Sequence, residues 1–172
     1  GEVVITELMI DPLKAEEYWG EWVELRNVTD EVLSLVGCQL IDESGDQGEL
    51  GFPLGTLVVT PHSEVVLGPT NLVIKNGGVL VDGLYANLLL ANTADSVGLQ
   101  CGEELVDVVS YDALSWPILA GRSLSLSPEM TDTAENDEPA AWCAGSASFG
   151  LGDLGTPGVV NGPCPLVDNL CL

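Results

Sequence analysis

Many short apolar runs, separated by turn-forming residues, follow one another along this chain, and no stretch keeps the spacing of an amphipathic helix. Short runs at close intervals are typical of a β-sandwich or barrel. The pattern predicts strands over residues 3–10, 22–26, 33–41, 54–60, 64–67, 72–74, 79–81, 88–90, 96–100, 104–111 and 123–126. We therefore expect an all-β fold.

Three local features refine this expectation. Residues 3–10 are β-branched and apolar on both faces, which indicates a strand covered on both sides. Residues 13–20 lack a steady helical spacing and end at Gly20, so we expect a loop there. Gly37 stands inside the third apolar run and predicts a β-bulge.

The chain changes character after residue 128. A length of 172 residues, 46% of them hydrophobic, suits one domain with a substantial core. We expect a sandwich over residues 1–128 and an irregular extension over residues 129–172, because the acidic and then Gly-rich tail cannot form a core of its own. Trp142 and a disulfide of Cys143 are expected to pin the extension to the sandwich, with the last residues mobile.

Acidic residues dominate the charge. The 27 Asp and Glu stand against four Lys and Arg, which gives a net charge of −23. Nucleic-acid affinity depends on Lys and Arg displacing counterions, so DNA, RNA and anionic membranes are poor partners. No apolar run reaches membrane-spanning length. We expect a monomer that meets a protein or glycan at the cell surface.

The five cysteines lack the C-x-x-C spacing of zinc and redox sites. Widely spaced cysteines fit structural disulfides formed outside the cytoplasm, in the extracellular space, at the cell surface or in the periplasm. Their number leaves one unpaired, and composition alone leaves several pairings open. We predict that Cys38 joins Cys101, that Cys143 joins Cys164, and that Cys171 is left over.

Two carboxylates are the candidates for catalysis. Glu7 and Glu24 occupy matching places in two strands that the fold sets side by side, so they are a candidate acid and nucleophile pair of a glycosidase. The alternative is that they bind loop backbone or pair with Arg26 or Lys14. Burial of either carboxylate in a closed hydrogen-bond network would remove the hydrolase hypothesis.

Two acidic segments carry the hard oxygen ligands that calcium prefers. The first contains Asp42, Glu43 and Asp46, and neither segment has the spacing of an EF-hand. The second segment, which needs something to order it, is the candidate calcium site, with the ligands Asp132, Glu135, Asn136 and Asp137. A solvated acidic loop is the alternative for both segments.

Other side chains suggest binding rather than chemistry. His62, the one histidine, stands in an expected turn, and neither a Gly-x-Ser-x-Gly elbow nor a nucleotide-binding loop occurs. We therefore expect no enzyme activity and no cofactor except calcium. Trp22 is expected in the core, whereas Trp19 and Trp116 are candidate contacts for a partner.

An ordered succession of motifs carries a family resemblance. The motifs are VITELM (4–9), GEWVELRN (20–27), LVGCQL (35–40), LGT (54–56), DSVGL (95–99), VDVVSY (106–111), GRSL (121–124) and GTPGVVN (155–161). In this order they resemble the lamin tail domain family in its bacterial, secreted form. The resemblance covers most of residues 1–161.

The resemblance implies an immunoglobulin-like β-sandwich that is one module of an exported or surface-attached protein. Nuclear members are credited with chromatin contacts, but this acidic chain has no coiled-coil heptads, and we do not extend nucleic-acid binding to it. We expect a non-catalytic, extracytoplasmic binding or scaffolding module of a larger exported protein. The alternatives are a calcium-stabilised structural spacer and, less favoured, a carboxylate-dependent hydrolase.

Overall fold

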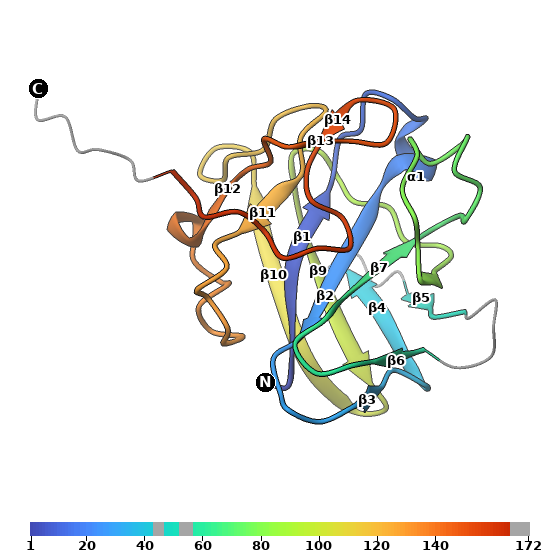
Figure 1. Cartoon of the computed structure of the whole chain (residues 1–172), viewed down its shortest axis with the longest axis vertical. Helices are drawn as coiled ribbons and strands as arrows, with labels where there is room; N and C mark the ends of the chain where they lie inside the picture. Colours follow the sequence, from blue (N-terminus) through green and yellow to red (C-terminus); the bar gives the residue numbers. More distant parts are fainter. Residues whose placement is uncertain (43–46, 52–56, 166–172) are drawn as a thin grey trace, which may run out of the picture.

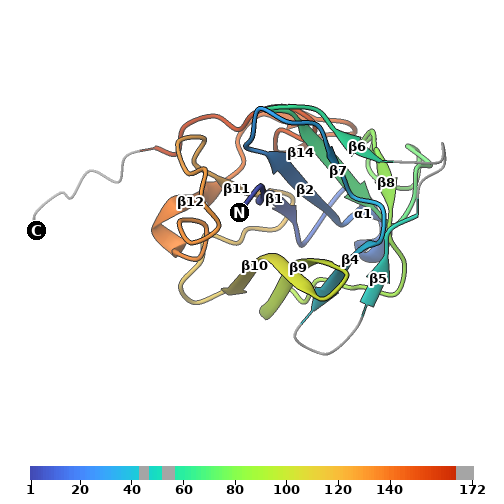
Figure 2. The ribbon, with the colours of Figure 1, turned by 90° about the horizontal axis from the view of Figure 1, so that it is seen from below.

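Two facing sheets form the body of the molecule (Figures 1 and 2). The structure is a computed structural model, and it describes residues 1–42, 47–51 and 57–165. The first sheet contains, in spatial order, β12 (Trp142–Ala144), β11 (Leu124–Leu126), β1 (Val3–Met9), β2 (Trp22–Asn27), β7 (Glu64–Gly68) and β8 (Gly83–Leu84). The second sheet contains β10 (Glu104–Asp112), β9 (Ala94–Cys101), β4 (Cys38–Asp42) and β5 (Gln47–Glu49). This is the all-β sandwich that the sequence predicted.

Smaller elements close the ends of the sandwich. They are the pair of β3 (Leu33–Ser34) and β6 (Val58–Val59), the pair of β13 (Ser148–Phe149) and β14 (Asp153–Leu154), the helix α1 (Glu17–Gly20) and a 3₁₀ turn over Pro139–Ala141. Within the described ranges, none of the helices has the length and apolar character needed to cross a membrane.

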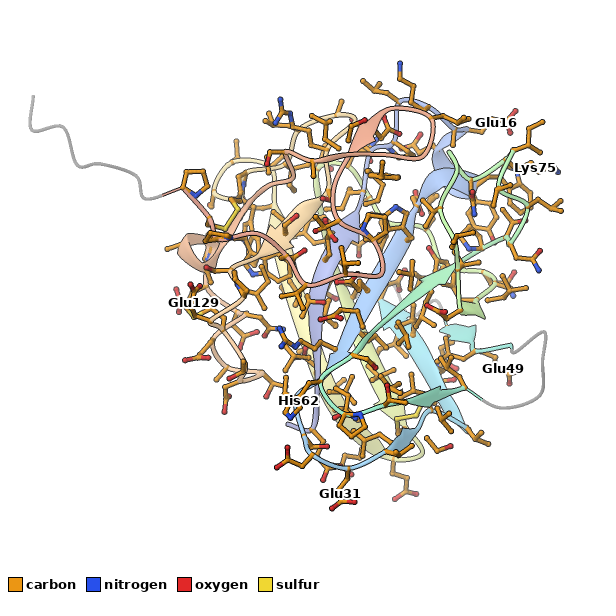
Figure 3. The ribbon with its side chains drawn as sticks, viewed as in Figure 1. Glu16, Glu31, Glu49, His62, Lys75 and Glu129 are labelled. Atoms are coloured by element: carbon orange, nitrogen blue, oxygen red, sulfur yellow. A yellow bond between two sulfur atoms is a disulfide. The ribbon has the colours of Figure 1, made fainter. Side chains whose placement is uncertain are left out.

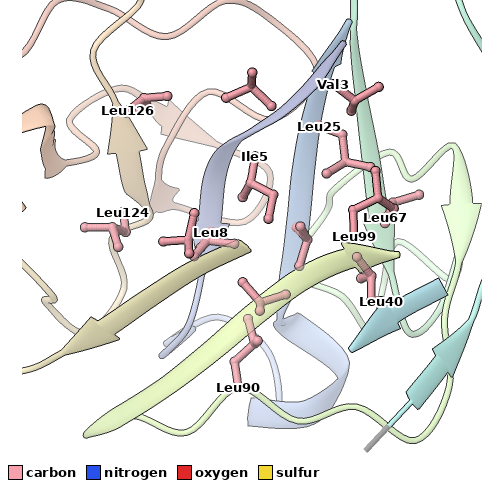
Figure 4. Packing of buried hydrophobic residues seen from close by; sticks show 14 of the residues in the cluster. Val3, Ile5, Leu8, Leu25, Leu40, Leu67, Leu90, Leu99, Leu124 and Leu126 are labelled. Atoms are coloured by element: carbon pink, nitrogen blue, oxygen red, sulfur yellow. The ribbon is translucent and has the colours of Figure 1, made fainter. Parts of the chain in front are cut away.

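The space between the sheets is filled by aliphatic side chains from both (Figure 4). Alternate residues of each strand point into this space, as the pleat requires. The fully buried members include Ile5, Leu8, Leu25, Leu40, Leu67, Leu90 and Leu99. Burial of so many large aliphatic groups is the main source of stability for the sandwich.

The outer face of the first sheet, which points away from the second sheet, is also covered. Met9, Trp22 and Val66 form a second buried apolar cluster there, with Phe149 of β13 packed against it. Residues 155–161, here called the strap, bind to the same sheet through hydrogen bonds to β1, β2 and β11. Every residue of β1 is therefore buried, which explains why its sequence is apolar on both faces.

Several local predictions are wrong. The run 33–41 is divided into β3 and β4 by a turn at Gly37, whose φ of +82° ends the strand where a bulge was expected. Residues 72–74, 79–81 and 88–90 are not strands, although their apolar residues suggested strands. A one-turn helix, α1, lies in the segment 13–20, where a loop was expected.

The described part of the extension, residues 129–165, contains regular structure that was not predicted. It supplies β12, which pairs with β11 and extends the first sheet by one strand. Trp142 opens this strand and is buried, and its indole Nε1 donates a hydrogen bond to the Asn136 carbonyl at 2.8 Å. Trp142 also belongs to the buried core cluster, with its ring centroid 5.8 Å from that of Trp116, so it packs the extension against the sandwich.

Candidate functional site

Glu7 and Glu24 lie directly opposite each other on β1 and β2, as their matching positions predicted. A register shift in β1 between Ile5 and Glu7 keeps Glu7 on the outer face beside Glu24. Neither side chain has any solvent exposure, because the strap covers both. The two carboxylates therefore form a closed pair between the sheet and the strap.

Glu7 accepts four hydrogen bonds. Its Oε1 accepts from the hydroxyls of Ser123 and Ser125 and from the Thr156 backbone amide at 2.9 Å. Its Oε2 accepts from the Thr156 hydroxyl at 3.2 Å. Burial raises the pKa of Glu7, and these four donors partly oppose that rise because they favour the ionised form.

Glu24 has fewer donors. Its Oε1 accepts from the Thr6 hydroxyl at 2.9 Å and its Oε2 from the Gly158 amide at 2.7 Å. Burial, with a smaller contribution from the charge of Glu7, raises the pKa of Glu24 to about 9. Two neighbouring buried carboxylates cannot both ionise easily, and the raised pKa of Glu24 keeps that group protonated near neutral pH.

Glycine at two positions and asparagine at a third allow the strap to lie close against the two carboxylates. A side chain at position 155 would place its Cβ 2.6 Å from Ser123 Oγ and 2.9 Å from Glu7 Oε1, so only glycine fits there. Gly158 has a φ of +83°, which glycine adopts without strain. Asn161 completes the attachment, because its Nδ2 donates to the carbonyls of Thr6 and Leu126 at 2.8 and 3.0 Å.

These contacts contradict the hydrolase hypothesis. A glycosidase pair must reach a sugar in an open cleft. Here the carboxyl groups of Glu7 and Glu24 accept hydrogen bonds from donors within the chain, and the strap covers them. The pair joins parts of the chain that are distant in the sequence.

A third buried carboxylate, that of Asp107, joins the two sheets. Asp107 of β10 accepts hydrogen bonds at its Oδ2 from the Ile5 amide at 2.7 Å and from Asn136 Nδ2 at 2.8 Å. Asn136 Nδ2 also lies 3.2 Å from the Ile5 carbonyl, to which it donates. Burial raises the pKa of Asp107 to about 6.

The predicted calcium ligands do not converge. Asn136 is fully buried against Asp107, Asp132 accepts from the Ala134 amide, and Glu135 accepts from the amides of Thr131 and Asp132. In the described part of the chain, no three His, Cys, Asp or Glu side chains are grouped closely enough to hold a metal ion. Of the other acidic segment, Glu43 and Asp46 lie outside the described residues.

The tryptophans and the histidine lie at different depths. Trp116, predicted as a partner contact, is buried with its ring centroid 5.8 Å from that of Trp142, because the tail folds over it. Trp22 is buried as predicted, and Trp19 is half-buried. His62 is exposed, and its Nε2 lies 2.8 Å from Asp30 Oδ1.

An open cavity of about 650 Å³ adjoins Trp19. It lies between the segment leading into α1 and the loop at residues 72–80, and it is lined by Leu13, Lys14, Ala15, Glu16, Trp19, Ile74 and Lys75. We call it the α1 pocket. Figure 3 places Glu16 and Lys75 at the same end of the molecule.

Two disulfides have the predicted pairing. Cys38 joins Cys101, which faces it across β4 and β9, and Cys143 of β12 joins Cys164. Cys171 lies outside the described residues. Such bonds fit an oxidising compartment.

Removing the Cys38–Cys101 bond will lower the free energy of unfolding. We expect the Cys38→Ala/Cys101→Ala protein to lose about 2–4 kcal/mol, because the bond closes a long loop in the unfolded chain. Urea unfolding of the two proteins measures the loss. Equal stability, or a peptide map that links Cys101 to Cys143, would contradict the pairing.

Sequence reasoning missed three of the buried polar anchors. Glu21 is 1% exposed and accepts from the Leu90 amide at 3.1 Å, and burial raises its pKa to about 8. Asp107 and Asn161 are the other two. All three lie inside the motifs 20–27, 106–111 and 155–161. Membership in these motifs was the sequence signal that could have identified them, because their residue types alone do not indicate burial.

The motifs of the resemblance thus supply the buried anchors of the sandwich. The family model described as Lamin Tail Domain matches residues 1–113. No curated protein and no solved structure gave a match. The match extends over about two thirds of the chain and includes β1, β2 and both strands that bear the Cys38–Cys101 bond. By this match, and with the immunoglobulin-like sandwich in agreement, the chain belongs to the lamin tail domain family.

Proposed function

We propose that this chain is a non-catalytic binding or scaffolding module that acts outside the cytoplasm as part of a larger exported protein. The main support for this proposal is that Glu7 and Glu24, the two carboxylates considered for hydrolysis, are buried and hydrogen-bonded within the chain. A rigid frame with loops at its ends is a common platform for binding a partner. The two disulfides support a site of action in an oxidising compartment.

Exposed apolar side chains indicate where binding takes place. Leu13 and Ile74 are 63% and 84% exposed at the rim of the α1 pocket, and Leu72 and Val73 of the same loop are also exposed. Large apolar groups gathered at one exposed site mark interaction surfaces on soluble proteins. The proposed partner is a protein, with a surface glycan as the alternative.

The test uses the oxidised full chain on a biosensor surface, with blocked peptides and surface glycans in solution. We expect saturable binding to at least one ligand without its turnover. Turnover of a glycan that Glu24→Gln abolishes would contradict the proposal, and so would failure to bind anything in the panel.

The calcium-stabilised spacer stays a prediction. Three of its four predicted ligands, Asp132, Glu135 and Asn136, make hydrogen bonds within the chain, so no observation favours it as the main function. A melting temperature that rises with calcium and falls with a chelator would support it.

A further inference from the structure

We propose that the α1 pocket binds a peptide segment of a partner protein in which a carboxylate stands beside a large aliphatic side chain. This inference rests on the proposed binding function and specifies its site and ligand. Its basis is the distribution of the few positive charges, the mixture of apolar and charged side chains in the lining, and the hydrogen bonds that hold the pocket walls.

The positive charges are distributed unevenly. Of the four basic residues, Arg26 lies 3.6 Å from Glu64, and Arg122 donates to the Gly145 carbonyl at 3.1 Å. The other two, Lys14 and Lys75, both line the α1 pocket. Neither lysine takes part in a salt bridge with any described residue. A protein with a net charge of −23 thus places both of its lysines, which form no ion pair among the described residues, at one cavity.

The lining of the pocket suits an aliphatic group as well as an anion. Leu13 and Ile74 expose most of their side chains at the rim, and the ring of Trp19 forms part of the wall. Glu16 is the only acidic residue in the lining. The pocket thus offers aliphatic contacts beside two lysine ammonium groups, a combination that a ligand with both an aliphatic group and a carboxylate can use.

The environment of Trp19 favours a peptide over a sugar. The Lys75 ammonium lies over the Trp19 ring, 4.9 Å from its centroid, and Tyr18 meets the same ring edge-on at 4.9 Å. A sugar that stacks on tryptophan needs an open ring face, and here the cation occupies one face. A carboxylate can instead bind the ammonium while an aliphatic side chain contacts Leu13 and Ile74.

Buried polar side chains hold both walls in place. Asp153, 3% exposed, accepts from the backbone amides of Leu13 and Lys14, at 3.2 and 3.0 Å from its Oδ2. Asn76, also 3% exposed, donates to the carbonyls of Thr70 and Val79 and accepts from the Val79 amide. Walls fixed before binding reduce the entropy lost when a ligand enters.

The negative charge of the surface around the pocket limits how many negative charges the ligand can carry. A polyanion that reached beyond the pocket would meet the acidic surface of the protein and be repelled. The pocket therefore suits one or two carboxylates in an apolar context, and it does not suit a nucleic acid or a long acidic tract.

The experiment compares two matched probes, acetyl-Leu-Glu-Leu-amide and acetyl-Leu-Gln-Leu-amide, with the oxidised full chain. Binding is followed by the NMR shift of the Trp19 indole N–H and by calorimetry. We expect saturable binding of the Glu peptide and binding of the Gln peptide that is weaker by about fivefold or more, as for a partly exposed charge contact.

Two variants locate the site. Lys75→Gln will weaken binding of the Glu peptide by about fivefold, close to its affinity for the Gln peptide. Ser110→Glu, on an exposed position of β10, changes the net charge by the same amount and will leave the affinity unchanged. Circular dichroism checks that both variants are folded.

The possible outcomes distinguish the proposed peptide ligand of the α1 pocket from the proposed binding function of the whole chain. Equal affinity for the two peptides, or an unchanged affinity in Lys75→Gln, overturns the proposed ligand chemistry. Binding of a panel glycan with no response to the Glu peptide also overturns it and leaves the binding function standing. Failure of the full chain to bind any peptide or glycan overturns both.

Discussion

The Glu7→Ala protein will lose about 3–5 kcal/mol of its free energy of unfolding. The substitution removes the acceptor of the Ser123 and Ser125 hydroxyls and of the Thr156 amide, whereas the Thr156 hydroxyl keeps Asn161 Oδ1 at 2.6 Å. Buried donors that lose their acceptor keep the full cost of desolvation. Urea unfolding at neutral pH, followed by circular dichroism, measures the change.

The matched control is Glu49→Ala, which removes an exposed carboxylate from β5. It removes the same side chain from an exposed position, so the difference between the two variants reports on the buried contacts of Glu7. We expect Glu49→Ala to leave the free energy of unfolding nearly unchanged. Equal stability of the two variants would show that Glu7 does not anchor the strap.

The protein will be more stable in mildly acidic solution than in alkaline solution. Burial raises the pKa of Glu24 to about 9, that of Glu21 to about 8 and that of Asp107 to about 6. Each folded-state pKa lies above its ordinary value of 4.5 or 3.8, so the folded state binds more protons. Their contribution to stability is complete below the ordinary pKa and is lost as pH rises through the raised one.

We therefore expect the melting temperature to fall by about 10 °C or more between pH 5 and pH 9, since one pKa unit corresponds to about 1.4 kcal/mol. General repulsion among the acidic residues acts in the same direction. Glu24→Gln, which removes the most strongly shifted of these three groups, will flatten the profile. Glu31→Gln, an exposed change of equal charge, will not. A melting temperature that rises toward pH 9 would contradict the assignment.

The sandwich was predictable because its strands are local features of the sequence. The alternation in residues 22–26 and the two apolar faces of residues 3–10 arise from burial that each strand experiences along its own length. The side-by-side placement of Glu7 and Glu24 followed from the same reasoning, because adjacent strands bring matching positions together.

The residues that cover Glu7 and Glu24 were not predictable. Thr156 of the strap donates a hydrogen bond to Glu7, which lies 149 positions away in the sequence. No local sequence pattern predicts such a contact. Apolar residues in loops misled the strand assignment for the same reason: Val79, Leu88 and Leu90 are buried by tertiary packing without belonging to strands. Asn136 was chosen as a calcium ligand by residue type, but its burial gives it the different role of holding Asp107.

The most direct test of the account is native-state hydrogen exchange at the Thr156 and Gly158 amides. These two groups donate to Glu7 and Glu24 at 2.9 and 2.7 Å, so they report on whether the strap closes the carboxylate pair. We predict protection close to that of the central strands β1 and β2, and its loss at Thr156 in the Glu7→Ala protein. Rapid exchange at both amides in the unaltered protein, with β1 and β2 still protected, would contradict the account, because the two carboxylates would then be open to solvent.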